Sequence, residues 1–202
     1  TSQGNSVATI VEASVDGEVV ARFEVSDQIK PTAASIVAEL RELGVRPMIV
    51  SGDAIGPVHD VAKQVGIDVS ETRSGVLPAD KLRIVGELQA SGASVAMVGD
   101  GVNDAAALVA ADLGIAMGTG TDAAMEAGDL TIVSGDLAVV PKALALSRRT
   151  LRIIQANLFW AFAYNVAAIP LAVAGLMNPV LAGLAMALSS VFVVANSLRL
   201  RR

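Results

Sequence analysis

Two patterns of apolar and polar positions follow one another along the chain, and each predicts a different kind of element. Ser6–Val15 and Glu18–Val25 alternate in character around Asp16-Gly17, which predicts a β-hairpin. From Asp27 onward, amphipathic stretches with helical spacing alternate with short apolar runs. The predicted helices are Thr32–Leu43, Val58–Val65, Asp80–Ala90 and Asp104–Ala111, and the predicted strands are Pro47–Val50, Val95–Val98, Gly114–Met117 and Leu130–Val133. This order predicts an α/β domain whose parallel sheet carries helices on both faces.

Two long apolar segments end the chain, at about Leu158–Met177 and Val180–Leu198. Neither contains a charged residue, and each has close to the about 20 residues that a helix needs to cross a bilayer. Only Asn178-Pro179 separates them, which predicts a transmembrane hairpin. Basic residues flank both segments on the same side, which is then the cytoplasmic side. Pro141–Arg152 is predicted to be a helix that leads directly into the first span.

Composition agrees with this division of the chain. The 202 residues are 53% hydrophobic and carry a net charge of −5, which comes from the part before the spans. No basic patch interleaved with aromatic residues is present, so we expect no nucleic-acid partner. The absence of Cys excludes disulfides and thiolate metal sites within these residues. The chain opens Thr-Ser-Gln-Gly without an initiator Met, so we expect it to be part of a longer protein.

The densest cluster of candidate functional residues is Gly99-Asp-Gly-Val-Asn-Asp104, directly after a predicted buried strand. Ligands of open α/β folds bind outside the carboxyl ends of the strands. The oxygens of Asp100, Asn103 and Asp104 suit Mg²⁺ held together with a substrate phosphate. A helix N-cap would explain only one of these polar residues and neither glycine.

Two further segments lie where a phosphate site would need them. Ser51-Gly52-Asp53 ends a predicted strand, where a hydroxyl and a backbone N–H could hold phosphate oxygens, although a simple turn explains it equally well. Lys81 follows Pro78-Ala79-Asp80 at a helix start, where the helix dipole disfavours a cation unless it faces an anion. Gly118–Ala123 fits a dinucleotide fingerprint, but the helix after it is too short for a full crossover.

Polar groups also interrupt the predicted spans. Tyr164 and Asn165 lie in the middle of the first span, and Met186, Ser189 and Ser190 in the middle of the second. Serines are ordinary in close helix packing. A buried Asn in lipid is costly and often marks a transport path, and a thioether sulfur is a soft ligand suited to Cu(I). No acidic or His ligand lies in either span, which argues against a hard or borderline divalent ion.

From about Val19 to the C-terminus, these residues resemble the heavy-metal-transporting P-type ATPases, and specifically their copper branch. Ser51-Gly52-Asp53 resembles the phosphate-binding Thr-Gly-Asp motif, and Pro78–Lys81 resembles the segment whose lysine contacts the aspartyl phosphate. Gly99–Asp104 matches the hinge motif and implies Mg²⁺ coordination by Asp100, with Asn103 and Asp104 nearby. Tyr164-Asn165 and Met186–Ser190 match the copper-branch signatures, which implies that Tyr164, Asn165, Met186 and Ser190 belong to a Cu(I) site.

The resemblance implies a haloacid-dehalogenase-like fold and three regions. These are residues 1–26 as a remnant of the nucleotide-binding domain, 27–140 as the phosphorylation domain, and 141–202 as the helix into the membrane with two transmembrane helices. The implied parent is an ATP-driven, Mg²⁺-dependent Cu(I) translocase in the plasma membrane. Its phosphorylation domain and both ends of the hairpin are cytoplasmic, and it exports metal from the cytoplasm.

The chain also departs from the family pattern. Ser51 replaces the usual Thr and keeps the hydroxyl, and Ala106 replaces the usual Pro of the hinge. The chain has no Asp-Lys-Thr-Gly segment with the phosphorylated aspartate and no Cys-Pro-Cys helix. We therefore expect the isolated chain to be inactive and to need the N-terminal part of the same pump as its partner.

Three other interpretations stay open. A membrane-anchored phosphohydrolase would need an aspartate nucleophile that no segment before Ser51 offers. A non-catalytic fragment or pseudo-enzyme would bind a partner half. A Zn²⁺ or Cd²⁺ pump of the same family would be expected to carry a charged residue in its last helices, and this chain has none there.

Overall fold

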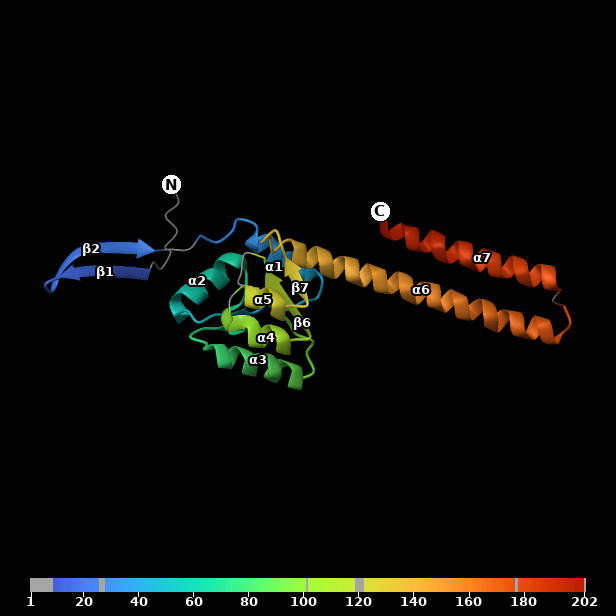
Figure 1. Cartoon of the computed structure of the whole chain (residues 1–202), viewed down its shortest axis with the longest axis horizontal. Helices are drawn as coiled ribbons and strands as arrows, with labels where there is room; N and C mark the ends of the chain where they lie inside the picture. The colour runs from blue at the N-terminus through green and yellow to red at the C-terminus, as the bar shows by residue number, and fades with distance from the viewer. Residues whose placement is uncertain (1–8, 26–27, 101, 119–121, 177, 202) are drawn as a thin grey trace. The chain divides into compact units, whose positions relative to one another are not determined.

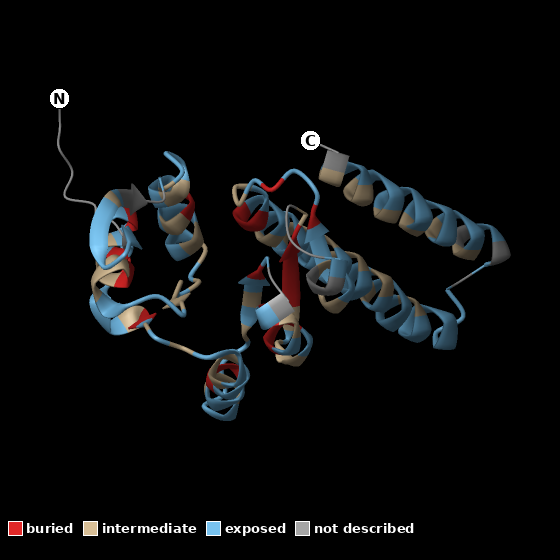
Figure 2. Ribbon diagram, turned by 60° about the vertical axis from the view of Figure 1, so that its left-hand side comes forward, coloured by how far each residue is buried: buried red, intermediate tan, exposed pale blue. Residues whose placement is uncertain are grey.

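A computed structural model describes residues 9–25, 28–100, 102–118, 122–176 and 178–201 (Figure 1). The chain divides into two compact units, Thr1–Pro141 and Lys142–Arg202. Buried residues lie in the first unit, whereas the helices of the second unit are exposed or half-buried along their described length (Figure 2). The first unit therefore has a buried protein core, whereas the apolar side chains of the two helices in the second unit are largely exposed.

The first unit begins with the predicted hairpin. Strands β1 (Thr9–Val15) and β2 (Glu18–Val25) pair antiparallel. Asp16 and Gly17, with φ of 51° and 86°, form the turn with two left-handed residues that suits a two-residue hairpin. The hairpin prediction is confirmed over these residues, while the predicted strand residues 6–8 lie outside the described part of the chain.

The next segment forms a small α/β layer. Helix α1 (Ala33–Glu42) and helix α2 (Ile55–Val65) accompany the short parallel strands β3 (Ile49–Val50) and β4 (Thr72–Arg73), with a 3₁₀ turn at Val69–Glu71. Ala62, Val65 and Ile67 are buried at the centre of this layer, and Ile29, Ala33, Val37 and Ile49 pack around them. Gly66 ends α2 in the left-handed conformation, which explains the glycine that closes this helix.

A second layer carries the longer sheet. Strands β5 (Ala96–Gly99), β6 (Leu113–Met117) and β7 (Leu130–Ile132) are parallel in the order β5-β6-β7. Helices α3 (Pro78–Ala90), α4 (Ala105–Ala110) and α5 (Asp122–Ala127) accompany them, and a 3₁₀ turn at Val102–Asp104 precedes α4. Gly114–Met117 of β6 are all buried. Because neighbouring strand residues point to opposite faces, both faces of β6 are covered.

The structure confirms the predicted α/β fold with parallel strands and shows how these strands pair. Among the described residues, β3-β4 and β5-β6-β7 form separate hydrogen-bonded sheets. Strand β4 was not predicted at all, since Thr72-Arg73 is too short to show a pattern. Helix α2 begins at Ile55, three residues before the predicted start at Val58. Its first turn, Ile55-Gly56-Pro57, contains no polar residue, so the alternation of apolar and polar positions does not mark it as helical.

The second unit is a pair of helices. Helix α6 (Val139–Val173) is continuous through Pro170, so the predicted helix at Pro141–Arg152 and the predicted first span are one element. It is long and apolar enough to cross a membrane. Helix α7 (Pro179–Leu198) follows, and its described apolar stretch Ala182–Leu198 is shorter than a usual span. A 3₁₀ turn, Arg199–Arg201, follows α7.

Polar and aromatic contacts hold α6 against α7. Asn157 Nδ2 donates to Ser197 Oγ at 3.1 Å, and Asn196 Nδ2 donates to Asn157 Oδ1 at 2.8 Å. The rings of Trp160 and Phe192 meet edge to face with centroids 5.9 Å apart. Since the partners in α7 come earlier in the sequence as the residues of α6 come later, from Asn157 with Ser197 to Trp160 with Phe192, the helices are antiparallel and their basic ends lie together, as the sequence predicts.

Candidate functional site

The loop Ser51-Gly52-Asp53 leaves β3 and is tied along its length to the segment that follows β4. Ser51 N–H donates to the Arg73 carbonyl at 2.9 Å, and Val76 N–H donates to the Ser51 carbonyl at 3.0 Å. Gly75 N–H donates to the Asp53 carbonyl at 2.8 Å. The backbone of the loop is therefore fixed, which is what a phosphate-binding loop requires if its donors are to be positioned before the ligand arrives.

The side chains of this loop close on each other. Ser51 Oγ donates to Asp53 Oδ2 at 2.7 Å and accepts from Asp53 N–H at 3.2 Å. A Cβ added to Gly52 would come no closer than 3.4 Å to the Val76 carbonyl oxygen, an ordinary contact distance. Gly52 is exposed, so packing inside the protein does not account for the glycine.

Lys81 lies in the first turn of α3, which begins at Pro78. Its Nζ donates to Asp104 Oδ1 at 2.5 Å, and both side chains are largely buried, with 15% and 10% of their area exposed. This pair resolves the anomaly seen in the sequence, because a cation disfavoured by the helix dipole is stabilised by a carboxylate. Asp80, its neighbour, pairs outward instead with Arg83 at 3.2 Å.

Asp104 is held in place by the end of strand β5. It is 7% exposed, and a Cβ on Gly99 would lie 2.6 Å from the Asp104 Cβ, so only glycine fits opposite it. Asp104 precedes α4, but its side chain makes no capping hydrogen bond to that helix. The N-cap explanation of this carboxylate is therefore wrong, and its partner is the ammonium of Lys81.

Asp100 and Asn103 both precede Asp104 in the sequence and are exposed. Neither makes a hydrogen bond or ion pair with another residue in the described part of the chain. Oxygens of a carboxylate and a side-chain amide at the carboxyl end of a strand are a donor set that fits Mg²⁺ with a phosphate oxygen as a further ligand. Asp104 differs, because one of its oxygens already accepts from Lys81.

Three charged groups of the first unit have shifted pKa values. Hydrogen bonds from Val95 N–H and from the side chain of Gln89 lower the pKa of Asp112, which anchors the start of β5. Hydrogen bonds to Glu87 and Asp80 raise the pKa of the Arg83 guanidinium. Hydrogen bonds from the hydroxyl and N–H of Ser70 lower the pKa of Asp68, which caps the Val69–Glu71 turn. These shifts are structural, since none belongs to a predicted phosphate or metal ligand.

The four predicted Cu(I) residues are exposed on the helix pair rather than gathered between the helices. Met186 is 74% exposed and Tyr164 is 41% exposed. Asn165 Nδ2 donates to the Ala161 carbonyl of its own helix at 3.0 Å, and Ser190 is exposed on α7. Within this unit, the hairpin does not bring the four side chains into one coordination shell.

The dinucleotide fingerprint at Gly118–Ala123 lies partly outside the described residues, at 119–121. Gly118 itself has a packing reason, since a Cβ there would lie 2.6 Å from Val133 Cα. Helix α5, which follows it, has only 6 residues, and this agrees with the prediction that the helix is too short for a dinucleotide-binding crossover.

Sequence reasoning missed two groups of residues that the structure brings forward. The segment 73–76 is hydrogen-bonded through its backbone to the Ser51 loop, and its sequence carries no motif that predicts this. Only its glycine, Gly75, hints at a turn, and it adopts a φ of 64°. Asn157 gave a signal that was overlooked, because an amide just before an apolar span pairs with Asn196 and Ser197 near the end of the next.

Comparison with known proteins gives a consistent result. Residues 2–112 match a haloacid dehalogenase-like hydrolase family, and residues 82–144 match a second family of the same description. Over 193 residues the chain is 52% identical to "Cation-transporting P-type ATPase B" of Mycobacterium bovis. Over 194 residues it is 55% identical to "Probable copper-exporting P-type ATPase V" of Mycobacterium tuberculosis. Both matches cover 96% of this chain and 25% of the relative, so the chain spans about a quarter of these proteins' length.

A solved structure agrees with these relatives. The crystal structure of a zinc-transporting PIB-type ATPase in the E2.Pi state matches 96% of this chain and 32% of that chain, with a TM-score of 0.85 and 35% sequence identity. The fold, the family matches and the relatives thus point the same way: the chain belongs to the haloacid dehalogenase-like hydrolases, and its relatives there are the metal-transporting P-type ATPases.

Proposed function

We propose that this chain is the phosphorylation-domain and membrane-hairpin portion of an ATP-driven pump that exports Cu(I). The observation that carries the proposal is the buried Lys81–Asp104 pair, 2.5 Å apart, at the carboxyl end of β5. A buried ion pair costs desolvation energy and is weak evidence for stability. An ammonium held ready beside a strand end, next to exposed carboxylate and amide oxygens, is what transfer of a phosphoryl group needs.

Each residue takes a role in that transfer. The Lys81 ammonium donates to oxygens of the transferred phosphoryl group, and Asp104 orients Lys81 before the substrate arrives. Ser51 Oγ and the exposed N–H of Gly52 hold further phosphate oxygens. Asp100 and Asn103 would hold Mg²⁺, and Asp104 would support the site from its pair with Lys81. When bound, Mg²⁺ neutralises charge on the phosphoryl oxygens.

The phosphorylated aspartate comes from a part of the pump outside these 202 residues, since no Asp-Lys-Thr-Gly segment occurs in them. The β1-β2 hairpin belongs to the nucleotide-binding domain in this proposal, and 141–202 lies in the plasma membrane with its basic ends on the cytoplasmic side. The exposed Tyr164, Asn165, Met186 and Ser190 meet cysteines from that other part to form the Cu(I) site. The exposure of Met186 and Asn165 supports this arrangement, because a ligand covered within the hairpin could not face another helix.

Zinc transport is the second candidate, because a zinc-transporting ATPase matches 96% of the chain. The residues between Lys142 and Arg202 include no Asp, Glu, His or Cys, so this hairpin offers zinc no strong ligand. A thioether at Met186 suits Cu(I) better.

A transport measurement separates the two metals. In the 55% identical mycobacterial relative, this chain replaces the segment that it matches, and the resulting chimera is reconstituted in vesicles. We expect ATP-dependent uptake of Cu(I) that falls about tenfold or more in a Met186→Ala variant, while Leu184→Ala, at an exposed apolar residue of the same helix, serves as the matched control. Uptake of Zn²⁺ in preference to Cu(I) would contradict the copper assignment.

A further inference from the structure

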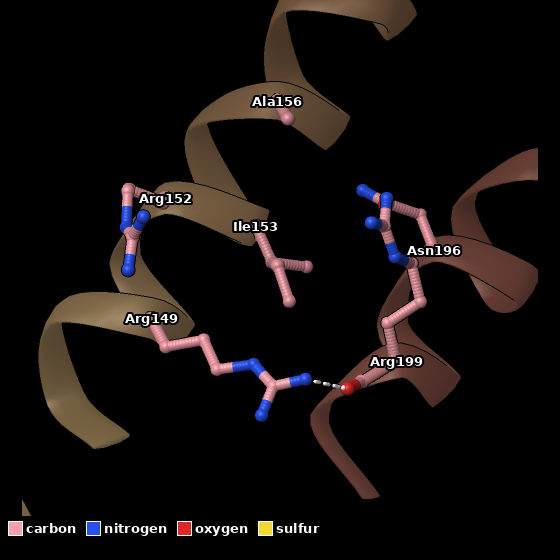
Figure 3. Close-up of a pocket in the computed structure, with 6 residues that line it drawn as sticks. All are labelled: Arg149, Arg152, Ile153, Ala156, Asn196 and Arg199. Carbon is pink, nitrogen blue, oxygen red and sulfur yellow. Dashed lines mark hydrogen bonds between the residues drawn. The ribbon is translucent and has the colours of Figure 1, made fainter. Parts of the chain in front are cut away.

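A cavity of about 320 Å³ opens between α6 and α7 at their basic ends (Figure 3). Its lining is Arg149, Arg152, Ile153, Ala156, Asn196 and Arg199. All six residues belong to the second unit, and no role in phosphoryl or metal transfer has been given to any of them. The antiparallel packing of the two helices is what brings Arg199 to the side of the α6 arginines.

The charge of this cavity is not balanced within its own unit. Lys142–Arg202 contains seven basic residues and no Asp or Glu. The three arginines that line the cavity contact neutral oxygens in the described part of the chain. Arg149 Nη2 donates to the Arg199 carbonyl, Arg152 Nε lies 3.4 Å from the Arg148 carbonyl, and Arg199 Nη1 lies 3.5 Å from Asn196 Oδ1. Each guanidinium has five N–H donors, so most remain available to an anion.

The cavity also has an apolar side that faces the membrane span. Ile153 and Ala156 line it shortly before the apolar segment that begins at Leu158. Arginine at this position lies at the level of lipid headgroups once α6 crosses a bilayer. A free inorganic anion would gain nothing from Ile153 and Ala156, whereas a lipid has a glycerol and acyl part to place against them.

We propose that this cavity binds the phosphate group of an anionic phospholipid headgroup. Guanidinium groups pair with phosphate oxygens through two parallel N–H donors, and Arg149, Arg152 and Arg199 supply such donors from both helices. The lipid then joins the cytoplasmic ends of α6 and α7 and neutralises their charge. The inference requires only that the hairpin lies in a bilayer, so it stands or falls separately from the transported metal and from phosphoryl transfer.

The test uses Trp160, the only tryptophan of the chain, four residues beyond Ala156 and 44% exposed. The whole 202-residue chain is placed in vesicles of phosphatidylcholine and phosphatidylglycerol, with bromine near the top of the acyl chains of one lipid at a time. Bromine quenches tryptophan fluorescence on contact. We expect brominated phosphatidylglycerol to occupy the site in preference to phosphatidylcholine, by about fivefold for each contacting arginine.

Charge-matched variants separate a built site from general attraction. Arg149→Gln with Arg152→Gln removes two charges from the cavity, whereas Lys142→Gln with Arg148→Gln removes two charges from the same helix outside it. The first pair should abolish most of the preference, and the second should keep it. Equal loss in both pairs, or no preference in the unaltered chain, would overturn the proposal.

Two further arms complete the test. Because Arg149 also contacts Arg199, in the turn after α7, its variant could loosen the hairpin. Arg152→Gln is therefore also measured alone, and its helix content is followed by circular dichroism. This variant should lose about fivefold of the preference with its helix content intact. Millimolar inorganic phosphate should leave the lipid preference unchanged. If phosphate removes the preference, the site takes free phosphate and the lipid assignment is wrong.

Discussion

At the scale of single residues, the site rests on one buried pair and one glycine. Lys81 and Asp104 satisfy each other, and Gly99 leaves the space that Asp104 occupies. Neither Asp100 nor Asn103 contributes to this packing, since both are exposed. The cluster at 99–104 thus contains residues that pack within the fold, Gly99 and Asp104, and residues whose side chains are exposed, Asp100 and Asn103.

Removing either partner of the pair leaves an uncompensated buried charge. We expect Lys81→Ala or Asp104→Ala to reduce the local free energy of unfolding by about 3 kcal/mol, and the double variant to lose less than the sum. Amide hydrogen exchange of the α4 backbone in the detergent-solubilised chain measures this local free energy of unfolding. Arg83→Ala, on the exposed face of α3, is the control and should change it little. Additive losses in the double variant would show that the two residues do not interact.

Glycine substitutions distinguish close packing from flexibility. Gly99→Ala would force a Cβ to 2.6 Å from the Asp104 Cβ and should destabilise the β5–α4 region by about 2 kcal/mol. Gly86→Ala is the matched change in α3, where nothing lies within 4 Å, and should stabilise that helix by about 0.5–1 kcal/mol. Amide hydrogen exchange should show a lower local free energy of unfolding in α4 for Gly99→Ala and a higher one in α3 for Gly86→Ala. The same sign in both would refute the packing argument.

The lowered pKa of Asp112 gives the fold an acid dependence. Its carboxylate accepts from Val95 N–H at 2.8 Å, so the folded pKa lies below the ordinary value of 3.8. Stability from this group is therefore fully present above pH 3.8 and is lost as the pH falls through the lowered pKa. Asp112→Asn should flatten the acidic part of the curve that plots the free energy of unfolding against pH. Glu39→Gln, at an exposed residue of α1, should leave that part of the curve steep. An unchanged limb in Asp112→Asn would exclude the linkage.

At the scale of elements, the helices were predictable and the sheet was only partly so. Apolar periodicity and closing glycines such as Gly66 marked the helices, because both act over many residues. Strands β3 and β4 have two residues each, which is too few for a period to show. The division into two sheets depends on which strands hydrogen-bond, and no single strand's pattern encodes that.

The hairpin of α6 and α7 tests how polar contacts join two apolar helices. Asn157→Leu removes the bonds to Ser197 and Asn196 and should weaken helix association by about 0.6 kcal/mol. Asn165→Leu is the matched control, since its described bond stays within its own helix. Trp160 emission during denaturation in detergent, sensitive to the ring contact with Phe192, reports the separation. Equal weakening in both variants would contradict the assigned interface.

At the scale of the whole molecule, short motifs in the sequence singled out the candidate phosphate-site residues but left their contacts open. It placed Ser51 and Asp104 after the ends of predicted strands and Lys81 at a helix start, and the structure joins Lys81 to Asp104. It could not show that 73–76 straps the Ser51 loop, because those hydrogen bonds are between backbone groups. It also could not show the arginine cavity, which exists only where the ends of two helices distant in sequence meet.

The most direct test of the account is phosphoenzyme formation from radiolabelled ATP. The isolated 202-residue chain should incorporate no label, since it has no acceptor aspartate in an Asp-Lys-Thr-Gly segment. The chimera with the 55% identical relative should be labelled, and Lys81→Ala should reduce its labelling by about a hundredfold, while Arg83→Ala should not. Labelling of the isolated chain, or undiminished labelling of the Lys81→Ala chimera, would contradict the role assigned to this site.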